Sequence, residues 1–212
     1  MITKLKDGSV LKTHNDLIGR AVRQTKNYYE HRLLTFIKSK ASFSKGVIVD
    51  VGANIGNHTM FFANNFDLKV ISFEPYPSNF QLLTENVSLN SKNSQVTCID
   101  LALSNEEYYY SFENVHQTNM GMVDIKSKIE TNGLKTSKLS KLIEDEIAIL
   151  KIDCEGQSSN VLKDAISNAK FVDDAIISVE GSKIEIDAIM PSNWNYLATL
   201  CNTPTQIYIK KQ

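Results

Sequence analysis

Three acidic side chains follow two short apolar runs in the second half of the chain. Asp153 and Glu155 come directly after Ile147–Ile152, and Glu180 follows the run 175–179. Because ligands bind at the carboxyl ends of the strands in open α/β sheets, we expect these carboxylates to lie around one point. Carboxylates placed there could remove the proton of an attacking hydroxyl or bind Mg²⁺, and Asp153 and Glu180 are the candidate metal ligands.

A glycine loop lies about 100 residues upstream of these acids. Gly52 and Gly56 enclose an Ala-Asn-Ile tripeptide directly after the β-branched run Val47–Val51, and an apolar segment with helical spacing follows. Glu74 ends the next apolar run, 18 residues after Gly56. Doubly wound folds place a carboxylate on ribose hydroxyls at this spacing, so the pattern predicts a nucleoside cofactor.

The composition of the loop indicates which nucleoside it binds. Nicotinamide cofactors favour G-x-G-x-x-G, whereas this loop has Asn54 at the middle glycine position and Asp50 two residues before Gly52. An acid at that position repels a pyrophosphate and can hold an ammonium group or steady the loop amides. S-adenosylmethionine carries an ammonium group, a cationic sulfur and two ribose hydroxyls, and is therefore the predicted cofactor.

Methyl transfer to an alcohol needs a group that removes the hydroxyl proton. Asp153 and Glu155 are the first candidates, and His58 at the start of the loop's helix is the third. A histidine there more often packs or bonds a nearby carbonyl group. His116 could approach a substrate from above, although a single histidine in a loop is more often without a chemical role.

Two further segments could contact ligands. Asp100 could accept a hydrogen bond from the adenine amine, with Leu101 against the ring, although an aspartate opening a turn is equally consistent with the pattern. The three tyrosines at 108–110 could stack on a sugar, but adjacent residues of a strand point to opposite sides, so packing is the expected role.

Size and charge limit the classes of function. The 212 residues suit one α/β domain, and 23 basic against 24 acidic side chains give a net charge of −1, which favours a small-molecule or glycan substrate over nucleic acid or an anionic membrane. The three cysteines have no C-x-x-C spacing, which predicts neither disulfides nor zinc. The N-terminal residues lack an apolar core, and no run is long enough to span a bilayer. We therefore expect a soluble cytoplasmic protein.

Periodicity predicts the elements that position these residues. Residues 1–45 should form a hairpin around Asp7-Gly8 and a lead helix or two over 15–40, and residues 46–212 a Rossmann-like core within the same single domain. A helix capped by Ser78 should end near Asn90, and residues 104–134 should form short strands and loops over the site. The other predicted elements are strands at 70–73, 95–99, 147–152 and 175–179, a helix at 159–169, and an edge strand at 206–210.

The chain resembles the FkbM family of S-adenosylmethionine-dependent methyltransferases from the lead helix to the strand ending at Glu180. The resemblance is carried by NYYEHRLL, VIVDVGANIGNHTMFFA, VISFEPYPSNFQLLTENVSLN, ALSN, the NMG of residues 119–121 and LKIDCEG. It implies a class I methyltransferase fold, a doubly wound α/β sheet of seven strands in the order 3-2-1-4-5-7-6. It also implies O-methylation of a hydroxyl on a sugar, glycan or natural product.

The predicted cofactor-binding set combines the resemblance with the patterns above. Its members are Asp50, Gly52, Ala53, Asn54, Gly56, Asn57, Glu74, Pro75, Asp100, Leu101 and Asp153. Two departures from the family pattern concern the acceptor. Glu180 is followed by Gly181, where relatives commonly carry a histidine shortly after the acid, and Gln157 stands where the family usually has an acid.

Three other functions remain consistent with the residues. A nicotinamide-dependent oxidoreductase is disfavoured by Asn54 and Asp50. A nucleic-acid methyltransferase is disfavoured because no N/D-P-P-Y segment, base-stacking motif or basic excess is present. A non-catalytic relative that only binds the cofactor has the same sequence pattern, because a fold does not imply a function.

Overall fold

The computed structural model describes residues 1–115, 123–127, 134–201 and 204–211. Within these residues seven strands form one twisted sheet in the order β11-β12-β10-β9-β3-β4-β5, which in chain order within the sheet is 3-2-1-4-5-7-6. β12 alone runs opposite to the other six strands of this sheet. The predicted doubly wound α/β class is confirmed. The strands are β3 (Val47–Val51), β4 (Lys69–Phe73), β5 (Val96–Ile99), β9 (Ile147–Ile152), β10 (Phe171–Glu180), β11 (Trp194–Leu200) and β12 (Thr205–Lys210).

The two central strands are buried on both faces. Every residue of β3 and β9 is buried, as expected for runs rich in Val, Ile and Leu in a parallel sheet, and the buried residues include Asp50 and Lys151. Side chains alternate along β3, so that Val47 and Val49 join the core on one face of the sheet and Ile48 the core on the other. This rigid centre holds the ends of β3 and β9 side by side.

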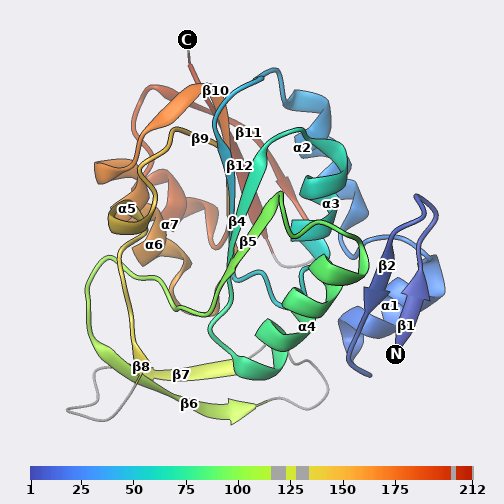
Figure 1. The fold of residues 1–212 in the computed structure, drawn as a ribbon. Helices are drawn as coiled ribbons and strands as arrows, with labels where there is room; N and C mark the ends of the chain where they lie inside the picture. Colours follow the sequence, from blue (N-terminus) through green and yellow to red (C-terminus); the bar gives the residue numbers. More distant parts are fainter. Residues whose placement is uncertain (116–122, 128–133, 202–203, 212) are drawn as a thin grey trace.

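Helices cover both faces of the sheet (Figure 1). One layer contains α2 (His31–Lys40), α3 (Asn57–Asn65) and α4 (Pro77–Leu89), and the other contains α5 (Leu139–Leu142), α6 (Ser158–Asn168) and α7 (Lys183–Asp187). Within the described residues, no helix is both long and apolar enough to cross a membrane.

The N-terminal residues form the predicted hairpin of β1 (Ile2–Lys4) and β2 (Val10–Lys12), followed by α1 (Leu17–Thr25). Two asparagines at the end of α4 fix the hairpin to the core: Asn90, the C-cap residue, accepts from the Val10 amide at 2.9 Å, and Asn86 accepts from the Lys12 amide at 2.6 Å. Asn86 also donates to the Ile55 carbonyl group in the glycine loop at 2.7 Å. The hairpin is therefore linked to the loop through one side chain.

The lead segment forms two helices, one of the two outcomes that the periodicity allowed. α1 ends at Lys26 and α2 begins after Glu30, and both residues adopt left-handed backbone conformations with φ near 55°. The turn between them brings Tyr29 and Glu30 to the edge of the sheet where the glycine loop lies.

The segment after β5 contains the predicted short strands. β6 (Tyr109–Val115), β7 (Val123–Ser127) and β8 (Leu134–Lys135) form a separate small sheet in the order β7-β6-β8 at the lower end of the molecule in Figure 1. His116 and the NMG of residues 119–121 lie outside the described residues.

Three local predictions were wrong. β12 was expected at the edge of the sheet, but it pairs with both β10 and β11, and β11 forms the edge. β10 begins at Phe171 rather than at residue 175, because a left-handed Asp174 shifts its pairing with β9 and lets the strand continue. Ser78 does not cap α4, which starts at Pro77 and has Tyr76 at its N-cap without a side-chain bond.

Candidate active site

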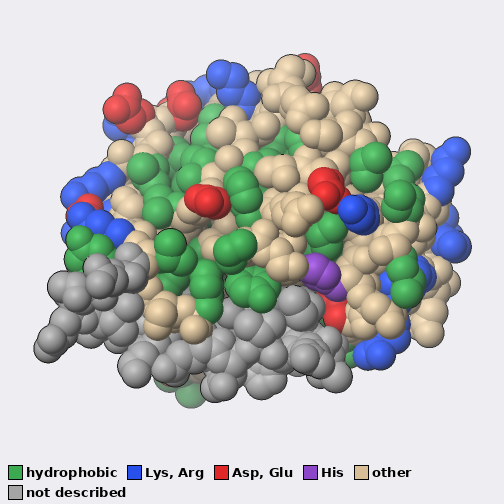
Figure 2. All heavy atoms as spheres, turned by 60° about the horizontal axis from the view of Figure 1, so that its bottom comes forward, with side chains coloured by type: hydrophobic (Ala, Val, Ile, Leu, Met, Phe, Trp, Pro, Cys, Tyr) green, Lys and Arg blue, Asp and Glu red, His purple; other side chains and the backbone are tan. Residues whose placement is uncertain are grey.

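A cavity of about 310 Å³ lies where β3, β4, β9 and β10 end. Its walls come from the glycine loop, the turn between α1 and α2, the segment after β5 and the residues that follow β9 and β10. In the space-filling view of this end of the molecule, hydrophobic side chains gather around the middle, with acidic side chains and a histidine beside them (Figure 2). The cavity is at the ligand-binding edge expected for an open α/β sheet.

The glycine loop takes a left-handed path at three positions. Gly52, Asn54 and Gly56 have φ of 73°, 52° and 83°. The amides of Gly52 and Ala53 both donate to the Phe73 carbonyl group at 2.9 Å, which fixes the loop against the end of β4. A Cβ atom on Gly52 would collide with the Asp153 carbonyl oxygen, so only glycine fits this close approach between the loop and β9.

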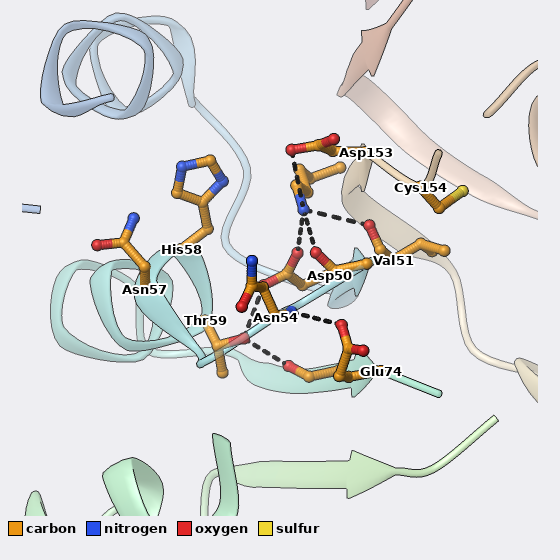
Figure 3. A network of polar contacts seen from close by, with 12 residues as sticks. Asp50, Val51, Asn54, Asn57, His58, Thr59, Glu74, Asp153 and Cys154 are labelled. Atoms are coloured by element: carbon orange, nitrogen blue, oxygen red, sulfur yellow. Dashed lines mark hydrogen bonds and ion pairs between the residues drawn. The ribbon is translucent and has the colours of Figure 1, made fainter. Parts of the chain in front are cut away.

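Glu74 connects the loop to the wall of the cavity. Its Oε2 accepts from the Asn54 amide at 2.8 Å (Figure 3), and its Oε1 accepts from the Tyr76 amide at 2.8 Å. The side chain is buried, and burial raises its pKa to about 7 although both amide bonds favour the ionised form. Each carboxylate oxygen keeps a second acceptor position, so Glu74 can receive further hydrogen bonds from a ligand.

Asp50 lies under the loop and is not part of the cavity wall. Its Oδ2 accepts from Thr59 Oγ1 at 2.6 Å, and its Oδ1 lies 3.1 Å from Lys151 Nζ (Figure 3). Lys151 also donates to the carbonyl groups of Gly52 at 2.7 Å and Val51 at 3.2 Å. Burial lowers the pKa of Lys151, but Asp50 and Asp153 outweigh this and hold it above the usual value. Lys151 is thus a fixed cation that joins the loop to β9.

The three acids predicted from strand ends all line the cavity. Asp153 Oδ2 lies 3.8 Å from Lys151 Nζ. A hydrogen bond between Asp153 and Glu180, together with burial, raises the pKa of Glu180. Burial raises the pKa of Asp153, but the positive charge of Lys151 and this hydrogen bond outweigh it, so the pKa of Asp153 is lowered. Glu155 is more exposed. Among the described residues, no group of three or more His, Cys, Asp or Glu side chains could hold a metal ion, so the predicted Mg²⁺ site at Asp153 and Glu180 is not supported.

The start of α3 carries two polar residues that face the turn between α1 and α2. Asn57 accepts from the Tyr29 amide at 2.9 Å and donates to the Tyr29 carbonyl group at 3.1 Å, so both of its polar atoms bind backbone. The next residue, His58, is buried, with Nε2 3.4 Å from Oε2 of Glu30. Both residues line the cavity, but the side-chain amide of Asn57 is used to join α3 to the turn between α1 and α2.

The opposite wall is apolar and aromatic. Leu101 lines the cavity with Ala102, Leu103 and Phe112, whose ring meets that of Tyr76 edge-on at a centroid distance of 5.3 Å. Asp100 is exposed and does not line this wall.

The structure gives the positions of the tyrosines at 108–110 and of Gln157, which stands where the family usually has an acid. Tyr110 is buried against Phe112 and Tyr109 is exposed, as expected for adjacent residues of a strand. Gln157 lines the cavity, and its Oε1 accepts from Ser104 Oγ at 3.2 Å.

Some of the remaining predicted cofactor-binding residues line the cavity and others do not. Ala53, Asn54 and Pro75 line the cavity, whereas Gly56 does not. The buried Oδ1 atom of Asn54 has no hydrogen-bond partner among the described residues. A buried polar atom without a partner is costly, so this amide is suited to a ligand.

The sequence did not predict that Tyr29, Glu30 and Lys151 take part in the site. Lys151 had a usable signal, because a lysine within a buried apolar strand must be paired. Glu30 lies in the NYYEHRLL segment that carries the family resemblance, but no spacing pattern links it to the residues it faces, which are distant in sequence.

The fold and the position of the cavity place the chain in the class I methyltransferase-like fold. A solved methyltransferase from Geobacter sulfurreducens superposes with a TM-score of 0.57 at 11% identity, covering 94% of this chain and 93% of that chain. At that identity the likeness concerns the fold alone.

Residues 50–199 match the methyltransferase FkbM domain, and the chain belongs to this family. The chain is 27% identical over 156 residues to the methyltransferase sdnD of Sordaria araneosa and 33% identical over 138 residues to the hexuronic acid methyltransferase AglP of Haloferax volcanii. The alignments cover 68% and 59% of this chain, and 60% and 54% of the two relatives. Membership of this family argues against the nicotinamide-dependent alternative.

Proposed function

We propose that the chain is an S-adenosylmethionine-dependent methyltransferase that methylates a hydroxyl group of a sugar, a glycan or a small natural product. The observation that carries the proposal is the buried Glu74 carboxylate, which accepts from the amide of Asn54 in a loop with three left-handed residues and still has acceptor capacity toward the cavity. Family membership gives the methyltransferase class.

The residues present fit this cofactor. Glu74 would accept hydrogen bonds from the ribose hydroxyls, and Leu101 and Phe112 would contact the adenine ring. The unpartnered Oδ1 atom of Asn54 would accept from the amino acid portion. Asp50 lies too deep for contact, and we assign it an indirect role through Lys151, which holds the loop carbonyl groups in place.

The cofactor, when bound, supplies a methyl group on a positively charged sulfur that leaves as a neutral thioether. The protein must then keep the acceptor oxygen in line with the methyl carbon, exclude water and remove one proton. The candidates for proton removal that line the cavity are Asp153, Glu155 and His58.

The charges around the cavity favour a neutral acceptor over an anionic one. Glu30, Asp153 and Glu155 line it, Glu180 shares a hydrogen bond with Asp153 that favours its neutral form, and Lys151 is already paired with Asp50. A carboxylate on the acceptor would meet like charges in a partly buried site. We therefore propose a neutral hydroxyl compound, although the name of the relative AglP refers to hexuronic acid.

We propose that the protein works in the cytoplasm. All three cysteines are unpaired, which agrees with a reducing cytoplasm. The near-zero net charge favours small-molecule or glycan partners over nucleic acid.

Isothermal calorimetry with S-adenosylhomocysteine tests the cofactor. We expect saturable binding by the wild type and by the exposed-site control Glu144→Gln, and binding weakened at least about tenfold in Glu74→Gln, because a hydrogen bond to a charged group contributes about 1.5–3 kcal/mol. The absence of heat at high micromolar ligand would overturn the proposal.

The acceptor is tested with S-adenosylmethionine and matched glycosides that carry a neutral, cationic or carboxylate ring substituent. Mass spectrometry should find a 14 Da gain on the neutral compounds. Methylation of RNA oligonucleotides instead, with a salt-dependent gel shift, would replace this proposal with the nucleic-acid alternative.

A further inference from the structure

The turn between α1 and α2 is fastened to the start of α3 by two consecutive residues on each side. Asn57 makes two hydrogen bonds to the backbone of Tyr29, at 2.9 and 3.1 Å. The following residues, His58 and Glu30, then face each other, with 3.4 Å between Nε2 and Oε2. The asparagine therefore fixes the register that brings the carboxylate to the imidazole.

The pair is buried, and its backbone is held in an uncommon conformation. The side chains of His58 and Glu30 are only 8% and 13% exposed. Glu30 has a φ of 57°, a left-handed conformation that a residue with a side chain rarely adopts and that surrounding contacts must maintain. Nε2 of His58 has no hydrogen-bond partner among the described residues, and Glu30 Oε2 faces it at ion-pair distance. The arrangement positions an acid against a histidine at the cavity wall, and the Cys201 thiol also bonds this acid.

We propose that Glu30 is a positioning residue that holds the Nε2–H tautomer of His58, so that Nδ1 faces the cavity and accepts the proton of the acceptor hydroxyl. This inference rests on the proposed function. Figure 3 shows the ring of His58 on the opposite side of the gap from Asp153, with a ring nitrogen directed into that gap. The 3.4 Å contact is not a hydrogen bond in this structure, and the proposal requires it to shorten when substrate binds, as catalytic contacts often do.

The other candidate bases are less suitable. Asp153 has Lys151 3.8 Å away and a hydrogen bond to Glu180, both of which stabilise its charge and lower its pKa. A carboxylate stabilised in this way is a weak base. Glu155 lies further out, on the exposed turn after β9.

His58 is poised as a neutral base. The charged groups around it are Glu30 from the turn, Asp50 from β3, Lys151 from β9 and Asp153, which directly follows β9. Burial and Lys151 lower the pKa of His58, and the three acids raise it by a smaller amount, so the net shift is downward from 6.5. The imidazole is therefore neutral at pH 7.5 with one free lone pair.

In the proposed step, one proton moves from the acceptor hydroxyl to His58 while the methyl group moves from sulfur to the acceptor oxygen. The acceptor O–H bond breaks and its proton moves to Nδ1 of His58. The electron pair stays on the acceptor oxygen, which forms the bond to the methyl carbon as that carbon's bond to sulfur breaks and its pair remains on sulfur. The imidazolium formed is stabilised by Glu30 on one side and by Asp153 on the other.

Nitrogen NMR of the imidazole side chains tests the positioning role without any turnover. The complex of uniformly ¹⁵N-labelled protein with S-adenosylhomocysteine contains four histidines, and His58→Asn assigns the signals of His58. We expect a neutral Nε2–H tautomer at pH 7.5 in the wild type and in the Glu144→Gln control. Glu30→Gln should give a mixture of tautomers and a lower His58 pKa, because a nearby negative charge is removed. An Nδ1–H tautomer in the wild type, or unchanged His58 signals in Glu30→Gln, would overturn the proposal.

Methyl transfer to the neutral glycosides tests the base. His58→Asn should lower kcat by about 100-fold or more, the range of general base catalysis, with little change in the KM for S-adenosylmethionine. Glu30→Gln should lower kcat less and move the acid limb of the pH profile to lower pH. Wild-type kcat in His58→Asn would refute the base role. If the wild type binds S-adenosylhomocysteine but methylates none of the glycosides, the acceptor proposed above is wrong, and the tautomer experiment alone decides the role of Glu30.

Discussion

The pKa of Glu74 gives the sharpest test of the cofactor site. Without ligand, burial raises the pKa of Glu74 to about 7, so the carboxyl group is partly protonated at neutral pH. Ribose hydroxyls would donate to the ionised form, and binding should therefore release the proton. The affinity for S-adenosylhomocysteine should rise with pH, and most steeply below pH 7.

The magnitude follows from simple linkage. If the ligand binds only the ionised form, the apparent Kd is multiplied by one plus the ratio of protonated to ionised Glu74. With a pKa of about 7, that factor is about 11 at pH 6 and about 1.1 at pH 8, which predicts a roughly tenfold gain in affinity, or about 1.4 kcal/mol.

Calorimetry in buffers with different ionisation enthalpies measures both quantities. Binding should release about 0.9 proton at pH 6 and about 0.1 at pH 8 through Glu74. Glu74→Gln should bind more weakly and lack this proton release. Other groups, including the ligand's amine, titrate equally in both proteins, so the difference between them isolates Glu74. Equal pH dependence in wild type and Glu74→Gln would refute the reasoning.

Three further outcomes can be measured on the same protein. Gly52→Ala should lower the free energy of unfolding in urea by at least about 2 kcal/mol more than Gly156→Ala, since both residues have positive φ but only the new Cβ at residue 52 meets backbone. Lys151→Met should cost about 3–5 kcal/mol because it leaves Asp50 buried without its cation, whereas Lys45→Met removes only an exposed ion pair and should leave the urea midpoint almost unchanged. Thermal unfolding should show that the stability of the wild type falls relative to Glu74→Gln as the pH rises from 4.5 to 7. The raised pKa of Glu74 means that the folded state binds this proton more tightly than the unfolded state. The resulting stabilisation, at most about 3 kcal/mol, is lost as the proton dissociates.

The sequence predicted the parts of the fold that depend on local pattern. Val47–Val51 and Ile147–Ile152 are apolar except for one charged residue each, and such runs are typical of strands buried on both faces. The spacing between Gly56 and Glu74 equals the length of the helix and strand that follow the glycine loop. It therefore predicted that Glu74 lies at the same edge of the sheet as the loop. Periodicity and spacing are properties of single elements or of neighbours in the chain.

Predictions failed where the outcome depended on partners distant in sequence. The residues of β12 have the same alternating pattern at an edge as between two strands, and only the pairing with β11 decides the position. Asp50 was expected in contact with the cofactor because it precedes the loop, but its side chain points to the α3 face of the sheet, where Thr59 and Lys151 bind it. The alternation of side chains along β3 could have predicted that direction.

The contacts around the cavity imply that its two sides are held with different rigidity. Lys151, buried in β9, contacts the carbonyl groups of Val51 and Gly52 and the carboxylates of Asp50 and Asp153, so it joins the glycine loop to the centre of the sheet. The wall formed by Tyr29 and Glu30 is instead held to α3 by the amide of Asn57, on a turn whose ends are left-handed. Loss of the Asn57 amide should therefore disturb proton removal before it disturbs cofactor binding. Asn57→Ala should keep most of the affinity for S-adenosylhomocysteine while the NMR signals of His58 change as they do in Glu30→Gln. A loss of affinity equal to that of Glu74→Gln, with unchanged His58 signals, would show that the two walls form one rigid unit.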